Sequence, residues 1–220
     1  MKQPTDIQLR VKASLRPLEL DTATRLVVAN HYLHRPLHPL SRPYAYGIWW
    51  DEQLVGVTMY ARPHFARMRG WFAPYGEGQP LTNWQVLVHS RLWIADDAPR
   101  NLESWAMRAP LRPFNGQHVP RLVTDYLQAY PPIYPDQPFS IRLLLGWTHD
   151  RLHPNGTIYR ASGWQRVSTV ESLARKRHGG QELAAISGDR TMYSLHLPKP
   201  PDWWLPAFRE RSAVQQLQLF

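Results

Sequence analysis

Apolar residues recur along the chain in short runs that are typical of strands. The runs YAYGIWW and LVGVTMYA within residues 44–61 are separated by Asp51-Glu52-Gln53, which predicts a β-hairpin. Residues 84–94 (WQVLVHSRLWI) predict a third strand, and residues 139–147 (FSIRLLLGW) a buried one. Further strands are expected over residues 5–15, 164–170 and 192–197.

Helical periodicity occurs between these strands. Residues 20–32 predict a helix with Asp21 as its N-cap, which ends before the prolines of HRPLHPL. Residues 120–130 predict a second helix, with a proline in the first turn and apolar residues at helical spacing. Shorter helices are expected from Arg100 or Asn101 to Arg108 and over residues 155–162.

The order of these elements is β-α-β-β-β-α-α-β-α-β-β. This order predicts an α/β fold, with one mixed and largely antiparallel sheet flanked by helices. A chain of 220 residues can bury the core of one such domain, which we expect to span residues 1–197. The Pro- and Trp-rich residues 198–220 then form a tail that packs on the domain or extends from it.

Composition narrows the function classes. The chain has no cysteine, which excludes disulfides, a cysteine nucleophile and cysteine-based zinc sites. The net charge is +9 and arginine far outnumbers lysine, so a polyanionic partner is expected. The codon bias of a GC-rich genome is the alternative source of the arginine excess. No signal peptide or membrane-spanning run is apparent, and we expect a cytoplasmic protein without a membrane partner.

Standard catalytic motifs such as GxSxG, Walker A and HExxH are absent from the sequence. Acyl-CoA sites of ordinary acetyltransferases use a Gly-rich turn that receives a pyrophosphate at a helix N-terminus. The turn after the 84–94 strand reads ADDAPRNLESW instead, and Asp96 and Asp97 would repel a pyrophosphate. This argues against conventional binding of acetyl-CoA.

Four segments together resemble a known family. They are Asn30-His31-Tyr32 with His34-Arg35, then YGIWWDEQLVGVTMYARP, SRLWIADDAPRNLESW and WTHDRLHPNGTIYRASGWQ. In this order they resemble the Mom family of phage DNA-modification proteins, over roughly residues 25–170. The resemblance implies a fold similar to GNAT acyltransferases. It also implies that an acetamido (carbamoylmethyl) group is added to adenine N6, which protects DNA from restriction enzymes.

The resemblance also implies a set of site residues. Asp150 follows the buried strand and is the expected general base or metal ligand. Tyr159 would donate a proton or ligate iron. Arg91 would be buried in its strand and pair with Asp150, or hold a carboxylate or phosphate of the donor. His31 and Tyr32 together with Asp150 would form a nitrogen and oxygen site suited to Fe²⁺.

The donor is expected to be a small acyl or aminoacyl compound. Arg100, Asn101 and Ser104, in the helix-opening motif of the resemblance, are the candidates for binding it. Ser104 also has a simpler interpretation, as a residue that hydrogen-bonds within its own helix. His149 and His153, which flank Asp150, are alternative metal ligands.

Double-stranded DNA is the expected acceptor. Adenine N6 lies inside the base stack, so the base must be flipped out or presented on a single strand. Two basic segments are candidates for the DNA contact, and the alternative for each is a solvated charged surface. They comprise Arg62, Arg67, Arg69 and Trp71 in the long 62–83 loop, and Arg175, Lys176 and Arg177 further along.

Two other functions remain open at this point. One is an ordinary GNAT-type acyltransferase that acts on a small amine or a protein, against which CoA-independent DNA binding would argue. The other is a non-catalytic DNA-binding protein. A cluster of Asp150, Arg91 and Tyr159 opening into a pocket would argue against this second alternative.

Overall fold

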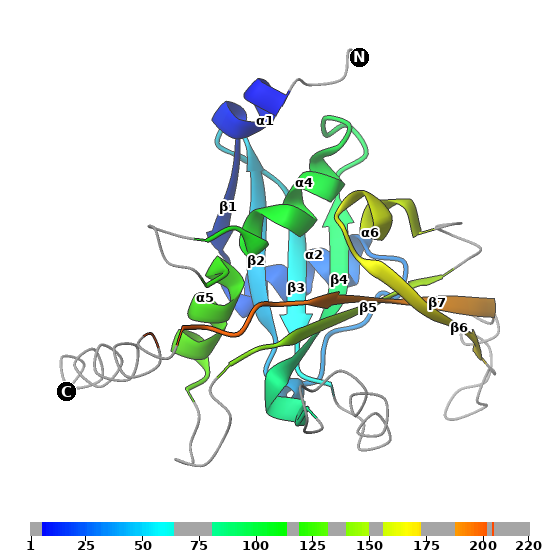
Figure 1. The fold of residues 1–220 in the computed structure, drawn as a ribbon. Helices are drawn as coiled ribbons and strands as arrows, with labels where there is room; N and C mark the ends of the chain where they lie inside the picture. Colours follow the sequence, from blue (N-terminus) through cyan, green and yellow to red (C-terminus); the bar gives the residue numbers. More distant parts are fainter. Residues whose placement is uncertain are drawn as a thin grey trace.

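A computed structural model gives the fold of residues 6–63, 81–113, 119–131, 140–149, 156–172, 188–201 and 204. Its centre is a twisted seven-stranded sheet in the spatial order β1-β2-β3-β4-β5-β7-β6 (Figure 1). This mixed sheet confirms the predicted fold class. The strands are β1 (Ala13–Pro17), β2 (Tyr44–Trp50), β3 (Gln53–Ala61), β4 (Val86–Ile94), β5 (Leu143–His149), β6 (Gln165–Ser172) and β7 (Gly188–His196).

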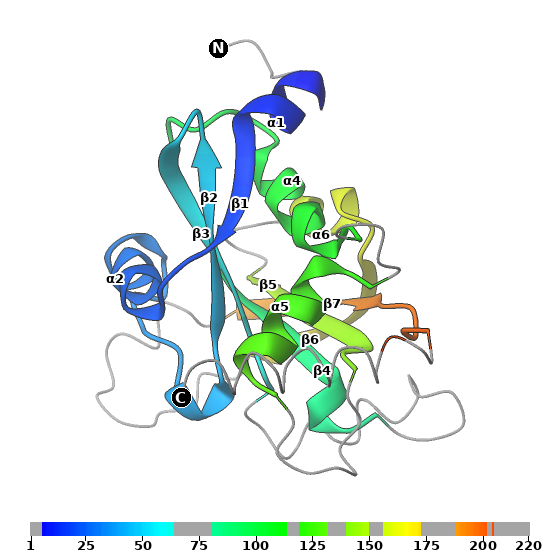
Figure 2. The ribbon, with the colours of Figure 1, turned by 90° about the vertical axis from the view of Figure 1, so that its left-hand side faces the viewer.

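Helices cover both faces of the sheet. Figure 2 shows α2 on one side of strands β1 to β3, and α4 and α5 on the other. Apolar side chains of α2, including Val27, pack against Val57 and Met59 of β3, while Tyr46 and Tyr60 face the opposite core. The helices are α1 (Asp6–Lys12), α2 (Leu20–Asn30), α4 (Leu102–Arg108), α5 (Arg121–Ala129) and α6 (Thr157–Ala161), with single 3₁₀ turns at Pro39–Ser41, Asn83–Gln85 and Ala109–Leu111. None of the helices in the described ranges is long and apolar enough to cross a membrane.

The predicted order of strands and helices is observed from residue 13 onward, but the opening strand is shorter than expected. Residues 6–12 form α1, so the prediction of a strand over 5–15 was wrong for its first half. The register explains the boundary. Ala13 pairs with Trp50, the last residue of β2, and the chain of β2 turns away at Asp51. Residues before Ala13 therefore have no strand beside them to continue the ladder.

Strands β4 and β5 run parallel and connect two antiparallel parts of the sheet. The segment between them contains α4 and α5, the crossover that a parallel pair requires. Their pairing extends from Val86↔Leu143 to His89↔Gly146 and ends there. Because β4 continues to Ile94 and β5 to His149, the carboxyl ends of the two strands separate.

A β-bulge in β4 lies at the point of this separation. Tyr60 of β3 pairs with His89 and Met59 pairs with Arg91, so Ser90 is the additional residue. Neighbouring residues of β3 point to opposite faces of the sheet. The bulge therefore directs His89 and Arg91 to opposite faces, although two residues apart in a regular strand share one face.

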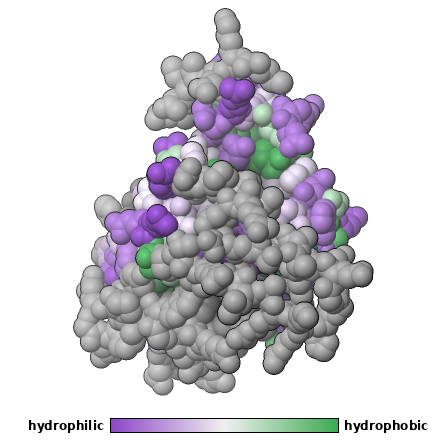
Figure 3. Space-filling model, turned by 90° about the vertical axis from the view of Figure 1, so that its right-hand side faces the viewer, coloured by the Kyte–Doolittle hydropathy of each residue, from purple (hydrophilic) through white to green (hydrophobic). Residues whose placement is uncertain are grey.

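The main core lies between the sheet and helices α4, α5 and α6. Trp204 from the C-terminal segment is fully buried in this core. The outer surface is different: on the side drawn in Figure 3, the described part is mostly hydrophilic with small hydrophobic areas between. Leu40 is one of the large apolar residues that are exposed on the described surface, and its relative exposure is 77%.

Removal of a buried side chain from α5 is expected to destabilise the fold. Leu122 is fully buried, so Leu122→Ala should lower the free energy of unfolding by about 2–5 kcal/mol, through lost apolar burial and the remaining cavity. Urea denaturation measures this change. Leu40→Ala, the same substitution at an exposed position, should change it by less than about 0.5 kcal/mol. Equal effects of the two substitutions would contradict the packing described above.

Candidate functional site

A cavity of about 560 Å³ lies where β4 and β5 separate. Its volume is in the range of small-molecule sites, and ligands commonly bind at the carboxyl ends of parallel strands. It is lined by residues from the end of α2, from β4 and β5, and from α6. These residues are Asn30, His31, Tyr32, His89, Ser90, Arg91, Leu92, Trp93, Ile94, Asp96, Glu103, Trp147, Thr148, His149, Gly156, Thr157, Ile158 and Tyr159.

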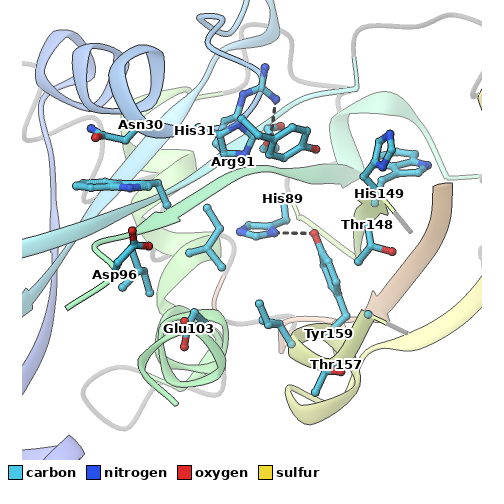
Figure 4. Close-up of a pocket in the computed structure, with 18 residues that line it drawn as sticks. Asn30, His31, His89, Arg91, Asp96, Glu103, Thr148, His149, Thr157 and Tyr159 are labelled. Atoms are coloured by element: carbon cyan, nitrogen blue, oxygen red, sulfur yellow. Dashed lines mark hydrogen bonds between the residues drawn. The ribbon is translucent and has the colours of Figure 1, made fainter. Parts of the chain in front are cut away.

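Three buried side chains form a hydrogen-bonded chain at the bottom of the cavity. The Tyr159 hydroxyl lies 2.9 Å from Nδ1 of His89, and Nε2 of the same imidazole lies 3.0 Å from Oγ1 of Thr58. Figure 4 shows the Tyr159 hydroxyl and the His89 ring meeting in the middle of the view. Burial lowers the pKa of His89 to about 3, with a smaller contribution from His31, so its imidazole is neutral at physiological pH.

Tyr159 can occupy this place because of the glycine opposite it. A Cβ atom added to Gly146 would lie 2.3 Å from Cε1 of the Tyr159 ring. The Tyr159 ring also stacks on that of Tyr193, the residue paired with Gly146 in β7, with centroids 5.0 Å apart and planes at 6°. Burial raises the pKa of Tyr159 strongly, so the hydroxyl is protonated and acts as a neutral hydrogen-bonding group.

Positive and aromatic groups form the side of the cavity nearest α2. The half-buried Arg91 donates from Nη1 to the carbonyl oxygen of Ser90 at 2.7 Å, and its buried Nε has no hydrogen-bond partner among the described residues. Tyr32 stands beside the buried His31, with ring centroids 4.3 Å apart. Burial raises the pKa of Tyr32, and the charges of Arg190 and Arg91 oppose this change. The positive charges of the two guanidinium groups, Arg91 and Arg190, therefore act on the end of the cavity that Tyr32 lines.

Carboxylates line another part of the cavity. Asp96 is exposed and Glu103 is half-buried, and Figure 4 shows them away from His149 and Thr148. No described residue forms a salt bridge with Arg91, so these carboxylates do not neutralise it. The two carboxylates extend the negative charge that the sequence places at this turn, which disfavours a pyrophosphate there.

Four of the five predicted catalytic residues line the same cavity. They come from three separate parts of the chain: His31 and Tyr32 follow α2, Arg91 lies in β4, and Tyr159 lies in α6. Figure 4 shows Arg91 and His31 on one side of the β4 ribbon and Tyr159 on the other. Asp150 lies outside the described residues, so its role stays a prediction. Its chain neighbour His149 is buried and lines the cavity.

The predicted donor-binding residues lie outside the lining of this cavity. Asn101 begins α4 with a left-handed backbone conformation, and Arg100 precedes it as an exposed residue. Oγ of Ser104 donates to the carbonyl oxygen of Asn101 at 3.1 Å, which confirms its interpretation as an internal hydrogen-bonding residue of the helix. Donor binding by these three residues stays a prediction.

Most of the predicted DNA contacts lie outside the described residues, namely Arg67, Arg69, Trp71, Arg175, Lys176 and Arg177. Arg62 is described and is 8% exposed. Its guanidinium stacks 3.7 Å from the centroid of the Trp84 ring, with Arg42 5.1 Å from the same ring. In this arrangement Arg62 packs between aromatic residues, and a contact with DNA stays a prediction for it.

The predicted iron site would need several His, Asp or Glu side chains close together. No group of three His, Asp or Glu side chains within the described ranges is placed to hold a metal ion. Nδ1 of His31 accepts a hydrogen bond from the backbone N–H of Leu33 at 3.2 Å, which places the proton of a neutral ring on Nε2. The iron site therefore depends on Asp150 and stays a prediction. The chemistry available from the described residues is that of hydrogen bonding and proton transfer.

His89 is not among the site residues that the sequence predicts. The signal was present, because His89 is a polar residue in the apolar run VLVHSRLWI, where a buried side chain must find partners. For His149 the sequence predicts only a role as an alternative metal ligand. The partners of His89, Thr58 and Tyr159, lie 31 and 70 residues away in the chain, so no local pattern connects them.

Comparisons with known proteins give one family. The model of the Mom protein family matches residues 12–125. No curated protein sequence matches the chain.

Solved structures of acetyltransferases align over most of the chain at low identity. One, from Salmonella typhimurium, modifies the N-terminal serine of the 50S ribosomal protein L7/L12 and covers 86% of this chain and 96% of its own, with 10% identity and a TM-score of 0.47. An N-acetyltransferase from Staphylococcus aureus Mu50 covers 84% and 99%, with 10% identity and a TM-score of 0.49. A GNAT family acetyltransferase from Elizabethkingia anophelis with acetyl-CoA bound covers 85% and 99%, with 8% identity and a TM-score of 0.47. TM-scores below 0.5 carry no conclusion about donor or acceptor.

The close approach of Tyr159 to Gly146 predicts strong coupling between the two positions. Gly146→Ala should force the Tyr159 ring away and break its 2.9 Å hydrogen bond to His89. We expect it to lower the free energy of unfolding by roughly 1–3 kcal/mol, because the added atom overpacks the core. In a double-mutant cycle measured by urea denaturation, Gly146→Ala should cost much less in the presence of Tyr159→Ala. If the effects of Gly146→Ala and Tyr159→Ala on the free energy of unfolding are additive, the close approach of the two residues is contradicted.

The lowered pKa of His89 predicts a dependence of stability on pH. Between pH 6.5 and about 3, the unfolded chain binds a proton at this imidazole and the folded chain does not. The free energy of unfolding should therefore fall as the pH is lowered from 7.5 to 5, with a contribution from His89 of up to about 1.4 kcal/mol per pH unit. Urea denaturation across this range should show a smaller slope for His89→Gln. The control is Tyr130→Phe, which should keep the slope of the parent protein, because burial raises the pKa of Tyr130 and the phenol does not titrate in this range.

Proposed function

We propose that this chain, which belongs to the Mom protein family because the family model spans more than half of it, is a transferase that modifies a base in DNA. The membership confirms the resemblance that its sequence motifs suggested. On that resemblance the acceptor is the N6 amino group of adenine, and the group added is derived from a small acyl or aminoacyl donor. Protection of phage or mobile-element DNA from restriction would be the biological consequence.

The cavity between β4 and β5 is the observation that carries this proposal. Four of the residues that the family resemblance implies for catalysis line it together, although they are far apart in the sequence. A cavity of about 560 Å³ is large enough for a flipped base beside a small donor. It contains aromatic rings against which a base can pack, Trp93 and Trp147, and polar groups that can hold its edge.

Each described residue has a role that its environment supports. The neutral Tyr159 hydroxyl, held by His89, forms a hydrogen bond with the base. Arg91 has unsatisfied hydrogen-bonding capacity and binds a carboxylate or phosphate of the donor. His31 and Tyr32 complete the wall of the site on the side of α2.

The reaction needs a group that removes a proton from the amine. As the new bond forms at N6, one N6–H bond breaks and the donor loses its leaving group. We assign the proton to the carboxylate of Asp150, on the basis of the sequence, because its neighbour His149 already lines the cavity. His89 is a weak base in its buried environment and is less suited to this step.

We expect duplex DNA as the acceptor, because the protein carries a net positive charge. A net charge of +9 favours association with the phosphate backbone. The carboxylates of Asp96 and Glu103 in the cavity disfavour a donor whose pyrophosphate would lie beside them. A donor smaller than acetyl-CoA fits these charges better.

Mass spectrometry of nucleosides tests this function. DNA from cells that produce the protein should contain a modified deoxyadenosine. Tyr159→Phe keeps the ring stacked on Tyr193 but removes the hydroxyl, and it should reduce the modification at least tenfold. Asp150→Ala should abolish it, because the proposed base is lost. The matched control is Tyr130→Phe, which removes a hydroxyl bonded to the carbonyl oxygen of Pro43 outside the cavity lining and should leave the modification intact.

The outcomes separate the alternatives. A modified pyrimidine would retain a DNA-modifying transferase but exclude adenine as its acceptor. Full modification by both Asp150→Ala and Tyr159→Phe would contradict the assignment of the site. Unmodified DNA together with binding of acetyl-CoA would favour an ordinary acyltransferase.

A further inference from the structure

Arg91 lies on the face of the sheet that α2 covers. It is paired with Met59 of β3, and paired residues of antiparallel strands share a face. Met59 packs against Val27 of α2 in one apolar cluster, so the side chain of Arg91 belongs to the same side. Arg91 also lines the cavity, which makes it a cation at the α2 side of the site.

Arg190 of β7 lies on this face as well. Successive residues of β5 point to opposite faces, and Gly146 faces the ring of Tyr159 from α6. His149, at an odd spacing from Gly146, therefore points to the α2 face, and Figure 4 shows it with Arg91 in the upper part of the view, with Tyr159 below. Arg190 is the antiparallel partner of His149 and shares its face.

Arg91, His149 and Arg190 form a row across three neighbouring strands. Strands β4, β5 and β7 follow one another in the sheet. The last pair that joins β4 to β5 is His89 with Gly146, and both Arg91 and His149 lie a few residues beyond it in the same direction. The row therefore crosses the sheet at the end where the cavity opens.

Tyr32 adds a hydroxyl group to this row at the mouth of the cavity. Its ring centroid is 6.5 Å from that of His149. Burial raises the pKa of Tyr32, and the charges of Arg190 and Arg91 oppose this change, which agrees with their position near the phenol. Tyr32 is 38% exposed, whereas Tyr159 at the bottom of the cavity is 7% exposed. The row is thus accessible from solvent.

No anion among the described residues neutralises these two guanidinium groups. The buried Nε of Arg91 has no hydrogen-bond partner there, and the ion pairs of the described residues include neither Arg91 nor Arg190. Burial lowers the pKa of Arg91, and the charge of Arg190 acts in the same direction. Two like charges held close together favour a ligand that carries negative charge.

We propose that Arg91, Arg190 and Tyr32 form a binding site for a phosphate group at the mouth of the cavity. The inference rests on the proposed function, and it adds Arg190 and Tyr32 to the residues that hold an anionic reactant. Donors from three separate parts of the chain suit a tetrahedral phosphate, whereas a planar carboxylate is satisfied by one bidentate arginine.

This phosphate can come from either of two reactants. A nucleotide that is flipped out places its base inside the cavity and leaves its own phosphates at the mouth, where the row lies. The donor is the second source, if it carries a phosphate. The chemistry of recognition is the same for both, and the experiments below separate them.

The first experiment measures binding of two single-stranded pentanucleotides with a central deoxyadenosine between thymidines. In one of them, uncharged methylphosphonates replace the two phosphates beside the deoxyadenosine. The parent protein should bind the natural oligonucleotide roughly fivefold or more tightly, because charged hydrogen bonds are lost with the other. Arg190→Gln should reduce this ratio to below about twofold. Arg190→Lys keeps the charge and should bring the ratio back above about twofold.

The matched control is Arg16→Gln, which removes the same charge at the opposite edge of the sheet. Arg16 lies in β1 and is paired with Glu52, away from the cavity lining. This variant should keep the ratio of the parent protein. Because Arg190 is half-buried, urea denaturation should show that its variants unfold at the same urea concentration as the parent protein.

The second experiment measures binding of inorganic phosphate by phosphorus-31 NMR. Arg190→Gln should weaken it roughly fivefold or more, while Arg16→Gln should not. Equal binding of the two oligonucleotides, together with this loss, would assign the phosphate to the donor. The proposal is overturned if neither ligand depends on Arg190, and a protein that still modifies DNA would then leave the proposed function intact. Binding of phosphate through Arg190, with neither binding nor modification of DNA, would refute the proposed function and leave the phosphate site supported.

Discussion

The separation of β4 from β5 is the constraint on which the rest of the site depends. Four pairs of residues join these strands, and the pairing ends at His89 and Gly146. Beyond this point the two strands leave a space inside the sheet. Backbone groups that would pair in a continuous sheet need other partners there, such as water or a ligand. A cavity in the middle of a sheet is therefore a direct consequence of where the ladder stops.

The bulge at Ser90 determines which side chains reach that cavity. Without it, His89 and Arg91 would lie on the same face of β4. With it, Arg91 lies with the residues that follow α2, and His89 lies with Tyr159 of α6. The cavity thus receives groups from both faces of the sheet. In the proposed reaction, the cationic side would hold an anionic donor and the neutral tyrosine and histidine would hold the base, so that the two reactants would approach from different sides.

Much of the fold could be predicted from the sequence because hydrophobic periodicity is local. The hairpin of β2 and β3 and helices α2 and α5 follow from patterns of a few residues. The first half of the predicted opening strand was wrong, since the length of β1 is limited by its partner β2 rather than by its own residues.

The site could be predicted only for the residues that the family resemblance implies, of which the described ones are His31, Tyr32, Arg91 and Tyr159. His89 carries no such mark, because it lies outside the four segments that carry the resemblance. His89 becomes a site residue only when the parallel pairing places it opposite Gly146, whose missing side chain admits Tyr159.

The neutral state of His89 links folding to recognition. A strand that needed only stability would have an apolar residue between Val88 and Ser90, because a buried imidazole requires two partners and weakens the fold in acid. The two partners, Thr58 and Tyr159, bind the two different ring nitrogens, so the imidazole connects the interior of the sheet with a hydroxyl that lines the cavity. A hydroxyl on its own rotates and can donate or accept. The hydrogen bond to His89 holds the Tyr159 hydroxyl at one place in the cavity wall, and Thr58 on the other ring nitrogen holds the imidazole in turn.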